Sequence, residues 1–256
     1  MALKLTISGC CGRMGQAIAR CALRESAASV VAAFEAPGHP AIGQSYATVL
    51  GLQMNGLPPV SEDAKTAISR GDVLIEFTLP EPTVQHVELA QSLGKPMVIG
   101  TTGLTDAQRA VVQAAARRVP ILLSPNMSIG VTVLFELVEL AARRLGPSVD
   151  VDIVESHHKG KKDSPSGTAK RLADVVASAR HQSPGAIPMH AIRAGEIIGD
   201  HTVIFAAGAE RIELTHRAQS REIFAQGAVR AAQFVATQPP GLYDMSHVLR
   251  ATEPGR

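Results

Sequence analysis

The chain has 256 residues, which is enough for one large domain or two modest ones with a buried core. Apolar residues make up 45% and charged residues 19%, a balance typical of a folded globular protein and not of a disordered one. The formal net charge of +2 predicts no general polyanion partner. Aromatic residues at 3% and the absence of Trp disfavour a nucleic-acid reader that stacks bases on aromatic rings.

The cysteines predict neither a disulfide framework nor a metal site. Cys10, Cys11 and Cys21 are odd in number and two are adjacent, and no Cys-x-x-Cys pair occurs. Free thiols indicate a reducing compartment. The sequence has no basic segment followed by a long apolar run, and no run of about 18 apolar residues. We therefore expect a cytoplasmic protein that is not associated with a membrane.

The first half alternates short apolar runs with helical patterns. Strand-like runs cover residues 3–9, 29–35, 72–78, 96–103 and 120–126. Helical spacing covers residues 13–23, 83–94 and 105–119, with Thr105 as the expected N-cap of the third. Strands that alternate with helices through short links predict a parallel sheet covered by helices.

The second half has a different pattern, and the change falls near Met127. Residues 128–146 predict one long helix ending at Gly146, and residues 149–158 alternate apolar and polar side chains as a half-exposed strand does. A helix is expected over 168–180. Residues 192–218 contain three alternating runs separated by glycine-bearing turns, which predicts an antiparallel sheet. A closing helix is expected over 222–237.

The segment "SGCCGRMG" places Gly9, Gly12 and Gly15 between the first strand and the first helix. Glycines there allow a tight turn and a close approach of the backbone to a pyrophosphate, and the helix N-terminus offers N–H groups to the anion. Glu35 follows the second strand, where a carboxylate can accept hydrogen bonds from ribose hydroxyls. Ala36 offers no positive charge for a 2′-phosphate, so NADH is expected to be preferred, although Arg13 could serve NADPH.

The segments "EFTLPEP", "GTTG" and "SPNMS" fall where successive strands end, at the edge of an open α/β sheet where ligands bind. Small and hydroxyl residues there, such as Thr78 and Gly100 to Thr102, suit close contact with a cofactor. Turn chemistry alone also explains each segment taken singly.

The stretch "ESHHKGKKDSPSGTAKRL" admits several functions. His157 and His158 are adjacent on an expected strand, so their side chains point to opposite faces and cannot easily share a metal ion. Its lysines lack the aromatic partners of a nucleic-acid site. Ser164 or Ser166 begins the next helix, and N–H groups at that helix start, with the Thr168 hydroxyl, can hold a carboxylate or phosphate. A histidine beside such an anion can donate a proton, although a surface loop is the simpler alternative.

The chain resembles the 4-hydroxy-tetrahydrodipicolinate reductase (dihydrodipicolinate reductase) family of lysine and diaminopimelate synthesis. The motifs that carry the resemblance span nearly the whole chain and are "GCCGRMG", "EFTLPEPT", "GTTG", "SPNMSIGV", "ESHHKGKKDSPSGTA", "IRAGEIIGDHTVIF" and "GLYDMSHVL". The pattern E-x-H-H-x-x-K-x-D-x-P-S-G-T-A is the most specific of them.

The resemblance implies an α/β fold with two domains. The first is a Rossmann-type dinucleotide-binding domain over 1–127, completed by 237–256. The second is an α+β domain over 128–236 that binds the cyclic dicarboxylate substrate and joins four subunits into a homotetramer.

The resemblance also implies roles for individual residues. His157 and Lys161 match the proton donors, and His158, Gly167, Thr168 and, less closely, Arg221 match substrate contacts. The positions that match cofactor contacts are Gly9, Cys10, Cys11, Gly12, Arg13, Met14, Glu35, Gly100, Thr101, Thr102, Ser124, Pro125, Asn126 and Met127.

Two departures from the family pattern bear on the cofactor. Cys10 and Cys11 replace smaller residues, which could narrow the approach of the pyrophosphate or expose the loop to oxidation. Ala36 replaces an arginine that many relatives direct at the 2′-phosphate. Two other functions stay open on the residues alone: another Rossmann oxidoreductase such as an aspartate dehydrogenase, and a dinucleotide sensor without catalysis.

Overall fold

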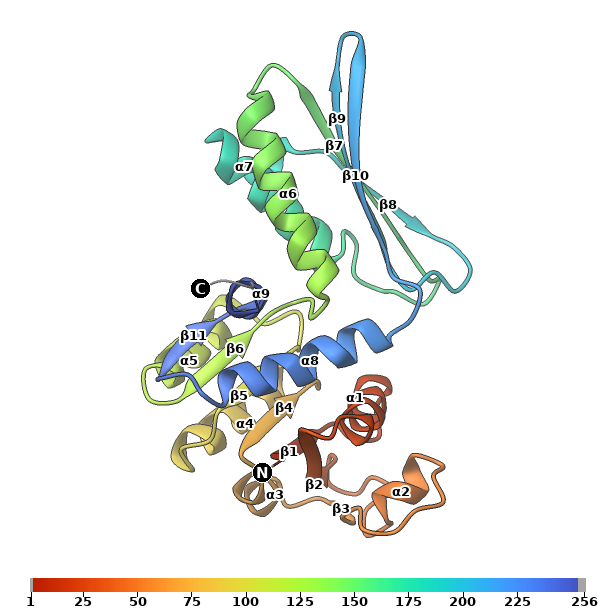
Figure 1. Ribbon diagram of the computed structural model, residues 1–256, viewed down its shortest axis with the longest axis vertical. Helices are drawn as coiled ribbons and strands as arrows, with labels where there is room; N and C mark the ends of the chain where they lie inside the picture. The colour runs from red at the N-terminus through yellow and green to blue at the C-terminus, as the bar shows by residue number, and fades with distance from the viewer. Residues whose placement is uncertain (1, 253–256) are drawn as a thin grey trace. The chain divides into compact units, whose positions relative to one another are not determined.

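The structure, a computed structural model, describes residues 2–252 and divides the chain into two compact units (Figure 1). Unit 1 consists of Met1–Met127 and Glu222–Arg256, and unit 2 of Ser128–Arg221. The return of the chain to the first unit therefore begins at Glu222 and not at the expected residue 237. Among residues 2–252, none of the helices combines the length and the apolar content that crossing a membrane requires.

Unit 1 is built on a parallel sheet of seven strands in the order β11-β6-β5-β4-β1-β2-β3. The strands are β1 (Leu3–Ser8), β2 (Ala28–Phe34), β3 (Val60–Ser61), β4 (Val73–Glu76), β5 (Met97–Ile99), β6 (Pro120–Leu123) and β11 (Gly241–Tyr243). Strands β4, β5 and β6 are almost wholly apolar because both faces of the sheet are covered. The strand order reverses at β1, between β2 and β4, which is where open α/β sheets bind their ligands.

The helices of unit 1 are α1 (Arg13–Arg24), α2 (Tyr46–Val49), α3 (Ala64–Arg70), α4 (Pro80–Ser92), α5 (Asp106–Ala116), α8 (Glu222–Val235) and α9 (Met245–Ala251). Thr105 caps α5 in a capping box with Gln108, as the sequence predicts. Helix α8 packs on α1 and across β4, β5 and β6 (Figure 1), and this packing explains why the boundary lies before α8. The buried residues of α8 have small side chains and are mostly alanine, so the helix can approach its neighbours closely.

Unit 2 has one sheet and two long helices. The helices are α6 (Ile129–Leu145) and α7 (Gly167–Arg180), and the strands are β7 (Asp150–His157), β8 (Met189–Arg193), β9 (Asp200–Ala207) and β10 (Glu210–Arg217), with a short 3₁₀ turn η1 (Pro184–Ala186). Helices α6 and α7 pack side by side over one face of the sheet (Figure 1). Helix α6 ends at Gly146, which has a φ of 74°, as expected.

The sheet of unit 2 is mixed, and the expectation of an antiparallel sheet is wrong for β8. Strands β7, β9 and β10 pair antiparallel, whereas β8 pairs parallel with β7. The cause is the connection, because helix α7 carries the chain from the end of β7 back to the start of β8, and such a crossover joins parallel strands.

Candidate active site

The glycine loop of unit 1 is a close-packed turn between β1 and α1. Gly9 has a φ of 59°, and a Cβ at this position would lie 2.8 Å from Thr78 Cγ2. A Cβ at Gly15 would lie 2.3 Å from the carbonyl oxygen of Gly9. Helix α1 begins at Arg13 with Gly12 as N-cap, so the N–H groups of its first turn have no acceptor within the helix. This cradle fits the pyrophosphate of a dinucleotide.

Gly15→Ala tests this close approach. The added methyl group meets backbone atoms of Gly9 and Cys10 that cannot move aside, so we expect weaker dinucleotide binding by at least about tenfold and a loss of about 1–3 kcal/mol in the free energy of unfolding. NADH fluorescence titration and urea unfolding measure the two effects. Gly208→Ala is the matched control, because its Cβ meets nothing within 4 Å, and it should change neither quantity.

Side chains hold the glycine loop in place. The Glu35 carboxylate accepts hydrogen bonds from the backbone N–H of Cys11 and of Ala36, both at 3.0 Å. The hydroxyl of Tyr46, which is fully buried, can donate to the carbonyl of Cys10 at 2.9 Å or of Gly15 at 3.1 Å. The role of Tyr46 is not visible in the sequence, since it lies in a connection without periodicity.

The two adjacent thiols differ in exposure. Cys10 is buried, so its side chain does not narrow the surface of the loop, whereas Cys11 is partly exposed. Burial raises the pKa of both thiols. Both are therefore protonated at neutral pH, which makes them weak nucleophiles in the absence of a metal ion.

The remaining cofactor candidates lie at the ends of β5 and β6. A Cβ at Gly100 would overlap the ring of Phe77, with 2.1 Å between the atoms, so this position requires glycine. Thr101 is buried, and its hydroxyl accepts a hydrogen bond from Thr83 at 2.8 Å, while Thr102 is exposed.

After β6, Ser124 forms a turn by donating to the carbonyl of Asn126 at 2.7 Å. Pro125 is exposed and Met127 is buried. Arg13 is exposed and Met14 partly exposed in the first turn of α1.

A buried carboxylate lies at the same edge of the sheet. Glu76 ends β4 and is fully buried, and its carboxylate is hydrogen-bonded to Nδ1 of His86 at 2.7 Å and accepts a hydrogen bond from the hydroxyl of Thr78. Neither Glu76 nor His86 was among the residues predicted from the sequence. Their contact links the end of β4 to α4 and positions Thr78 beside Gly9.

In unit 2, alternation along β7 brings the candidate proton donor into a buried face. Val151 and Ile153 belong to the apolar core beneath α6 and α7, and Glu155 and His157 continue the same face. On β9 the corresponding face begins with His201, which pairs directly opposite Glu155. The face thus changes from apolar to polar toward the N-terminus of α7.

Glu155 organises this polar end. Arg193 binds its carboxylate through two hydrogen bonds, of 2.9 and 2.8 Å, and the backbone N–H of Ser166 donates to it at 3.2 Å. Nδ1 of His157 also bonds to this carboxylate. Burial would raise the pKa of Glu155, but the hydrogen bonds from Arg193 and His157 outweigh burial and the pKa is lowered. The ionised Glu155 carboxylate accepts a hydrogen bond from the N–H at Nδ1 of His157. Nε2 is therefore the ring nitrogen that can face the reacting group.

The environment of His157 keeps it mainly neutral in the absence of substrate. Burial lowers the pKa of His157, the Glu155 carboxylate opposes that shift, and the positive charges of Lys161 and Arg193 add to it. Nε2 faces Gly199, where a Cβ would lie only 3.1 Å away. A negatively charged ligand beside Nε2 would therefore favour the protonated ring.

His201 lies next to His157 and is nearly fully buried. The two rings meet edge to face with 5.2 Å between centroids, and Nε2 of His201 is hydrogen-bonded to the hydroxyl of Ser166 at 3.2 Å. Ser166 is the N-cap of α7, since its Oγ accepts from the backbone N–H of Ala169 at 3.1 Å. His201 therefore connects the proton donor to the helix start. His201 was not among the residues predicted from the sequence, although it lies in the motif "IRAGEIIGDHTVIF".

The titration of His201 predicts an acid-sensitive unit 2. Burial lowers the pKa of His201 to about 3, and His157 adds to that shift. Below the ordinary histidine pKa of about 6.5, the unfolded chain binds a proton that the folded chain does not, so stability is lost as the pH falls from about 6.5 toward 3. His201→Gln removes this titrating group. In that pH window, the free energy of unfolding of the wild type should therefore fall by about 1.4 kcal/mol more per pH unit than that of the variant.

Urea unfolding followed by circular dichroism at several pH values measures this difference, because the chain has no Trp for fluorescence. His190→Gln, at an exposed histidine of β8, should keep the wild-type pH dependence. Equal pH dependence in the wild type and His201→Gln would contradict a neutral buried His201.

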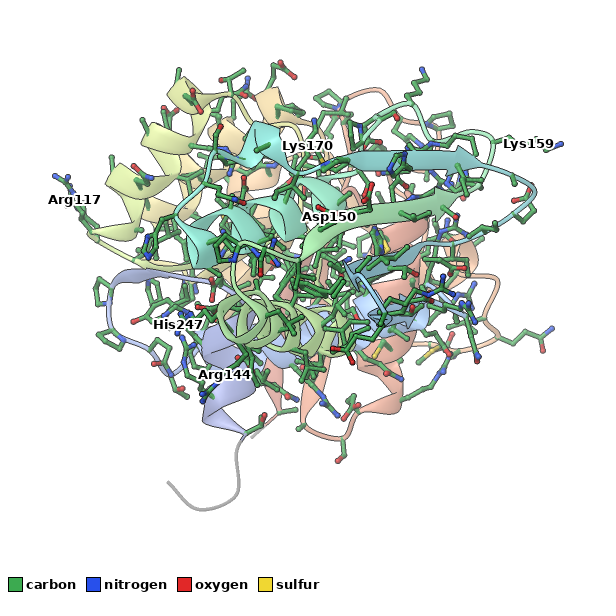
Figure 2. The ribbon with its side chains drawn as sticks, turned by 90° about the horizontal axis from the view of Figure 1, so that it is seen from above. Arg117, Arg144, Asp150, Lys159, Lys170 and His247 are labelled. Carbon is green, nitrogen blue, oxygen red and sulfur yellow. The ribbon has the colours of Figure 1, made fainter. Side chains whose placement is uncertain are left out.

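The other predicted substrate contacts lie around the same helix start. Lys161 pairs with Asp163 at 2.8 Å and is mostly buried, whereas Lys159 is exposed and points outward in Figure 2. Gly167 and Thr168 form the first turn of α7, and His158 follows the end of β7 with partial exposure. Arg221 ends unit 2, and within residues 2–252 it does not join the hydrogen-bonded group around His157.

Two sequence families match this chain. "Dihydrodipicolinate reductase, N-terminus" matches residues 3–127, and "Dihydrodipicolinate reductase, C-terminus" matches residues 130–249. The 4-hydroxy-tetrahydrodipicolinate reductase of Anaeromyxobacter dehalogenans is 45% identical over 96% of this chain and 97% of its own length. The enzyme of the same name from Citrifermentans bemidjiense is 41% identical over 96% of this chain and 98% of its own length.

A solved structure agrees with the sequence matches. The dipicolinate-bound dihydrodipicolinate reductase of Paenisporosarcina sp. TG-14 has a TM-score of 0.76 and 26% identity, and the alignment covers 95% of this chain and 98% of that one. The two halves of the family therefore account for both units, including the glycine loop of unit 1 and the His157 group of unit 2. This chain belongs to the 4-hydroxy-tetrahydrodipicolinate reductase (dihydrodipicolinate reductase) family.

Proposed function

We propose that the chain reduces 4-hydroxy-tetrahydrodipicolinate to tetrahydrodipicolinate in lysine and diaminopimelate synthesis, consuming NAD(P)H and one proton and releasing NAD(P)⁺ and the substrate hydroxyl as water. The observation that carries the proposal is the group of Glu155, His157 and Lys161 at the N-terminus of α7, in a chain that matches the family over both units. A dicarboxylate suits this place, because the first-turn N–H groups carry partial positive charge and Lys161 is positively charged.

In unit 2, His157 is the proposed general acid. Glu155 fixes its Nδ1 proton, so Nε2 is the atom that gives a proton to the reacting substrate. Lys161 neutralises substrate charge and supports the protonation, while His158, Gly167, Thr168 and Arg221 are proposed substrate contacts. Arg193 stays bound to Glu155 and acts on His157 only through that carboxylate.

In unit 1, the glycine loop and the ends of β2, β5 and β6 are proposed to hold the dinucleotide. The bound nicotinamide supplies a hydride to the substrate ring. The N–H groups at the start of α1 face the pyrophosphate, and Gly100 to Thr102 with Ser124 to Met127 border the remainder of the cofactor. Glu35 orients the adenosine ribose through its carboxylate, with Ala36 beside it.

NADH is the proposed preferred cofactor, because Ala36 is exposed and brings no positive charge to the ribose. Ala36→Arg should raise kcat/KM for NADPH relative to NADH by about tenfold, since a single arginine–phosphate contact contributes roughly 1.5–3 kcal/mol. Ala36→Gln, which has similar length and no charge, should leave the ratio near that of the wild type. A wild-type preference for NADPH would assign the 2′-phosphate to Arg13 or another residue.

A turnover assay separates this function from its two rivals. Loss of nicotinamide absorbance with fresh 4-hydroxy-tetrahydrodipicolinate, and no reaction with aspartate and NAD⁺, is the expected result. Aspartate oxidation alone would support an aspartate dehydrogenase. NADH binding without turnover of either substrate would support a dinucleotide sensor.

We also propose a cytoplasmic homotetramer joined through the sheet of unit 2. The face of this sheet opposite α6 and α7 presents apolar side chains, with Ile192 on β8 46% exposed and Val154 on β7 and Ile204 on β9 partly exposed. Apolar side chains on a broad sheet face are typical of a surface that associates. Sedimentation equilibrium of the wild type against a double variant, Ile192→Lys with Ile204→Lys, tests this assembly.

A further inference from the structure

The glycine loop carries two thiols, those of Cys10 and Cys11, to which the proposed dinucleotide binding assigns no role, and they lie beside the carboxylate of Glu35. Cys10 Sγ and Cys11 Sγ lie 3.8 Å apart, and Cys10, Cys11 and Glu35 each offer one ligand atom within 4.8 Å of the others. Within residues 2–252, this is the one group of three or more such side chains close enough to share a metal ion. The absence of a Cys-x-x-Cys pair predicts no metal site, whereas the fold brings Glu35 to the thiols from the end of β2.

The spacing of the thiols fits one tetrahedral metal ion. Zinc–sulfur bonds of about 2.3 Å at a tetrahedral angle separate two sulfur atoms by about 3.8 Å. The two sulfur atoms already have that separation. Glu35 joins when its carboxylate exchanges its 3.0 Å hydrogen bonds from the backbone N–H groups of Cys11 and Ala36 for the cation, and a side-chain rotation then brings an oxygen to the third position. Two sulfur ligands favour a thiophilic cation of the zinc class over magnesium or calcium, which prefer oxygen.

The backbone around the thiols is already fixed. The N–H of Cys10 donates to the carbonyl of Phe34 at 3.2 Å, and the side-chain amide of Gln16 donates to the carbonyl of Cys11 at 2.9 Å. Tyr46 holds the Cys10 carbonyl from the other side. Such outer contacts orient metal ligands and reduce the entropy lost on binding. Partial exposure of Cys11 and Glu35 leaves a route for the ion and a fourth position open to water.

We propose that Cys10, Cys11 and Glu35 form a binding site for a thiophilic divalent cation of the zinc class, and that this cation and the dinucleotide exclude each other. Binding displaces the two thiol protons and forms two metal–sulfur bonds and one metal–oxygen bond. The exclusion rests on the proposed dinucleotide site, because the Glu35 carboxylate cannot bind the ribose and the cation at once. The cation would thus compete with NADH for unit 1.

Co²⁺ is a suitable probe, since its visible absorbance reports tetrahedral sulfur ligation at wavelengths where NADH does not absorb. The full-length wild type should bind one equivalent of Co²⁺ with this absorbance, and Zn²⁺ should displace it. Cys11→Ser and Glu35→Gln should each weaken binding by tenfold or more, and Cys21→Ser, at the buried cysteine outside the group, should bind as the wild type does. No tetrahedral absorbance in the wild type, or its persistence in Cys11→Ser, would overturn the site.

Titration with NADH tests the exclusion. The cobalt absorbance should fall as NADH binds, and constant absorbance at saturating NADH would overturn the exclusion. NADH binding is measured separately by its fluorescence in metal-free protein. A failure of NADH to bind there counts against the proposed function, whereas the cobalt spectrum alone decides the metal site.

Discussion

His157→Gln is expected to lower kcat by about 10²–10⁴-fold while the Kd for NADH changes less than about twofold. Glutamine keeps a polar side chain of similar reach but cannot donate a proton from a titrating ring. NADH affinity should persist because His157 belongs to unit 2, whereas the glycine loop belongs to unit 1. Steady-state turnover and NADH fluorescence titration on the same preparation measure both quantities.

Two further variants define the specificity of that result. Lys161→Ala should also lower kcat severely and raise KM for the dicarboxylate, because it removes the positive charge proposed to neutralise the substrate. In the structure, Asp163 pairs with this charge at 2.8 Å. His190→Gln, at an exposed histidine of the same unit, should behave as the wild type. A parallel loss of NADH affinity in His157→Gln would contradict the assignment of the two tasks to separate units.

Glu155→Gln should act on His157 without touching the substrate. The carboxylate raises the pKa of His157 against the effect of burial, so its removal lowers that pKa further. A general acid is active when protonated, and activity falls as the pH rises through its pKa. The alkaline limb of kcat/KM should therefore move to lower pH in Glu155→Gln, with kcat at pH 7 reduced by about 10–100-fold.

The same substitution leaves the partly buried Arg193 without its anionic partner, and we expect the free energy of unfolding to fall by about 2–4 kcal/mol. Asp152→Asn, on the same strand, is the matched control, since Asp152 pairs with exposed His190 and not with His157. It should leave the pH profile unchanged. A profile for Glu155→Gln that keeps the wild-type limb would show that Glu155 does not control the proton on His157.

Much of the fold follows from local patterns that the sequence displays. The strands β1, β2, β4, β5 and β6 lie in runs that the sequence marks as strands, Thr105 begins α5 as its N-cap, and Gly146 ends α6. Strands β3 and β11 are too short to show periodicity. The parallel pairing of β8 depends on the path of α7, and the membership of α8 in unit 1 depends on its packing partners. Neither is encoded within the segment itself.

In the site too, some features follow from the pattern of a single segment, and others depend on contacts between residues far apart in the sequence. Alternation along β7 correctly separates buried His157 from partly exposed His158, and Ser166 caps α7 as one of the two expected serines. Arg193 meets Glu155 across 38 residues of sequence, and His201 meets Ser166 across 35. Pairing between β7, β8 and β9 creates these contacts, so no single-segment pattern predicts them. In unit 1, the parallel pairing of β1 with β2 brings Cys11 next to Glu35 in the same way.

Transfer of deuterium from NADH labelled at C4 of the nicotinamide tests the central claim most directly. The enzyme is incubated with labelled NADH and 4-hydroxy-tetrahydrodipicolinate, and the product is analysed by mass spectrometry. We expect one deuterium in the ring of each tetrahydrodipicolinate formed, with one NADH consumed per product. NADH consumption without labelled tetrahydrodipicolinate would contradict the assigned reaction.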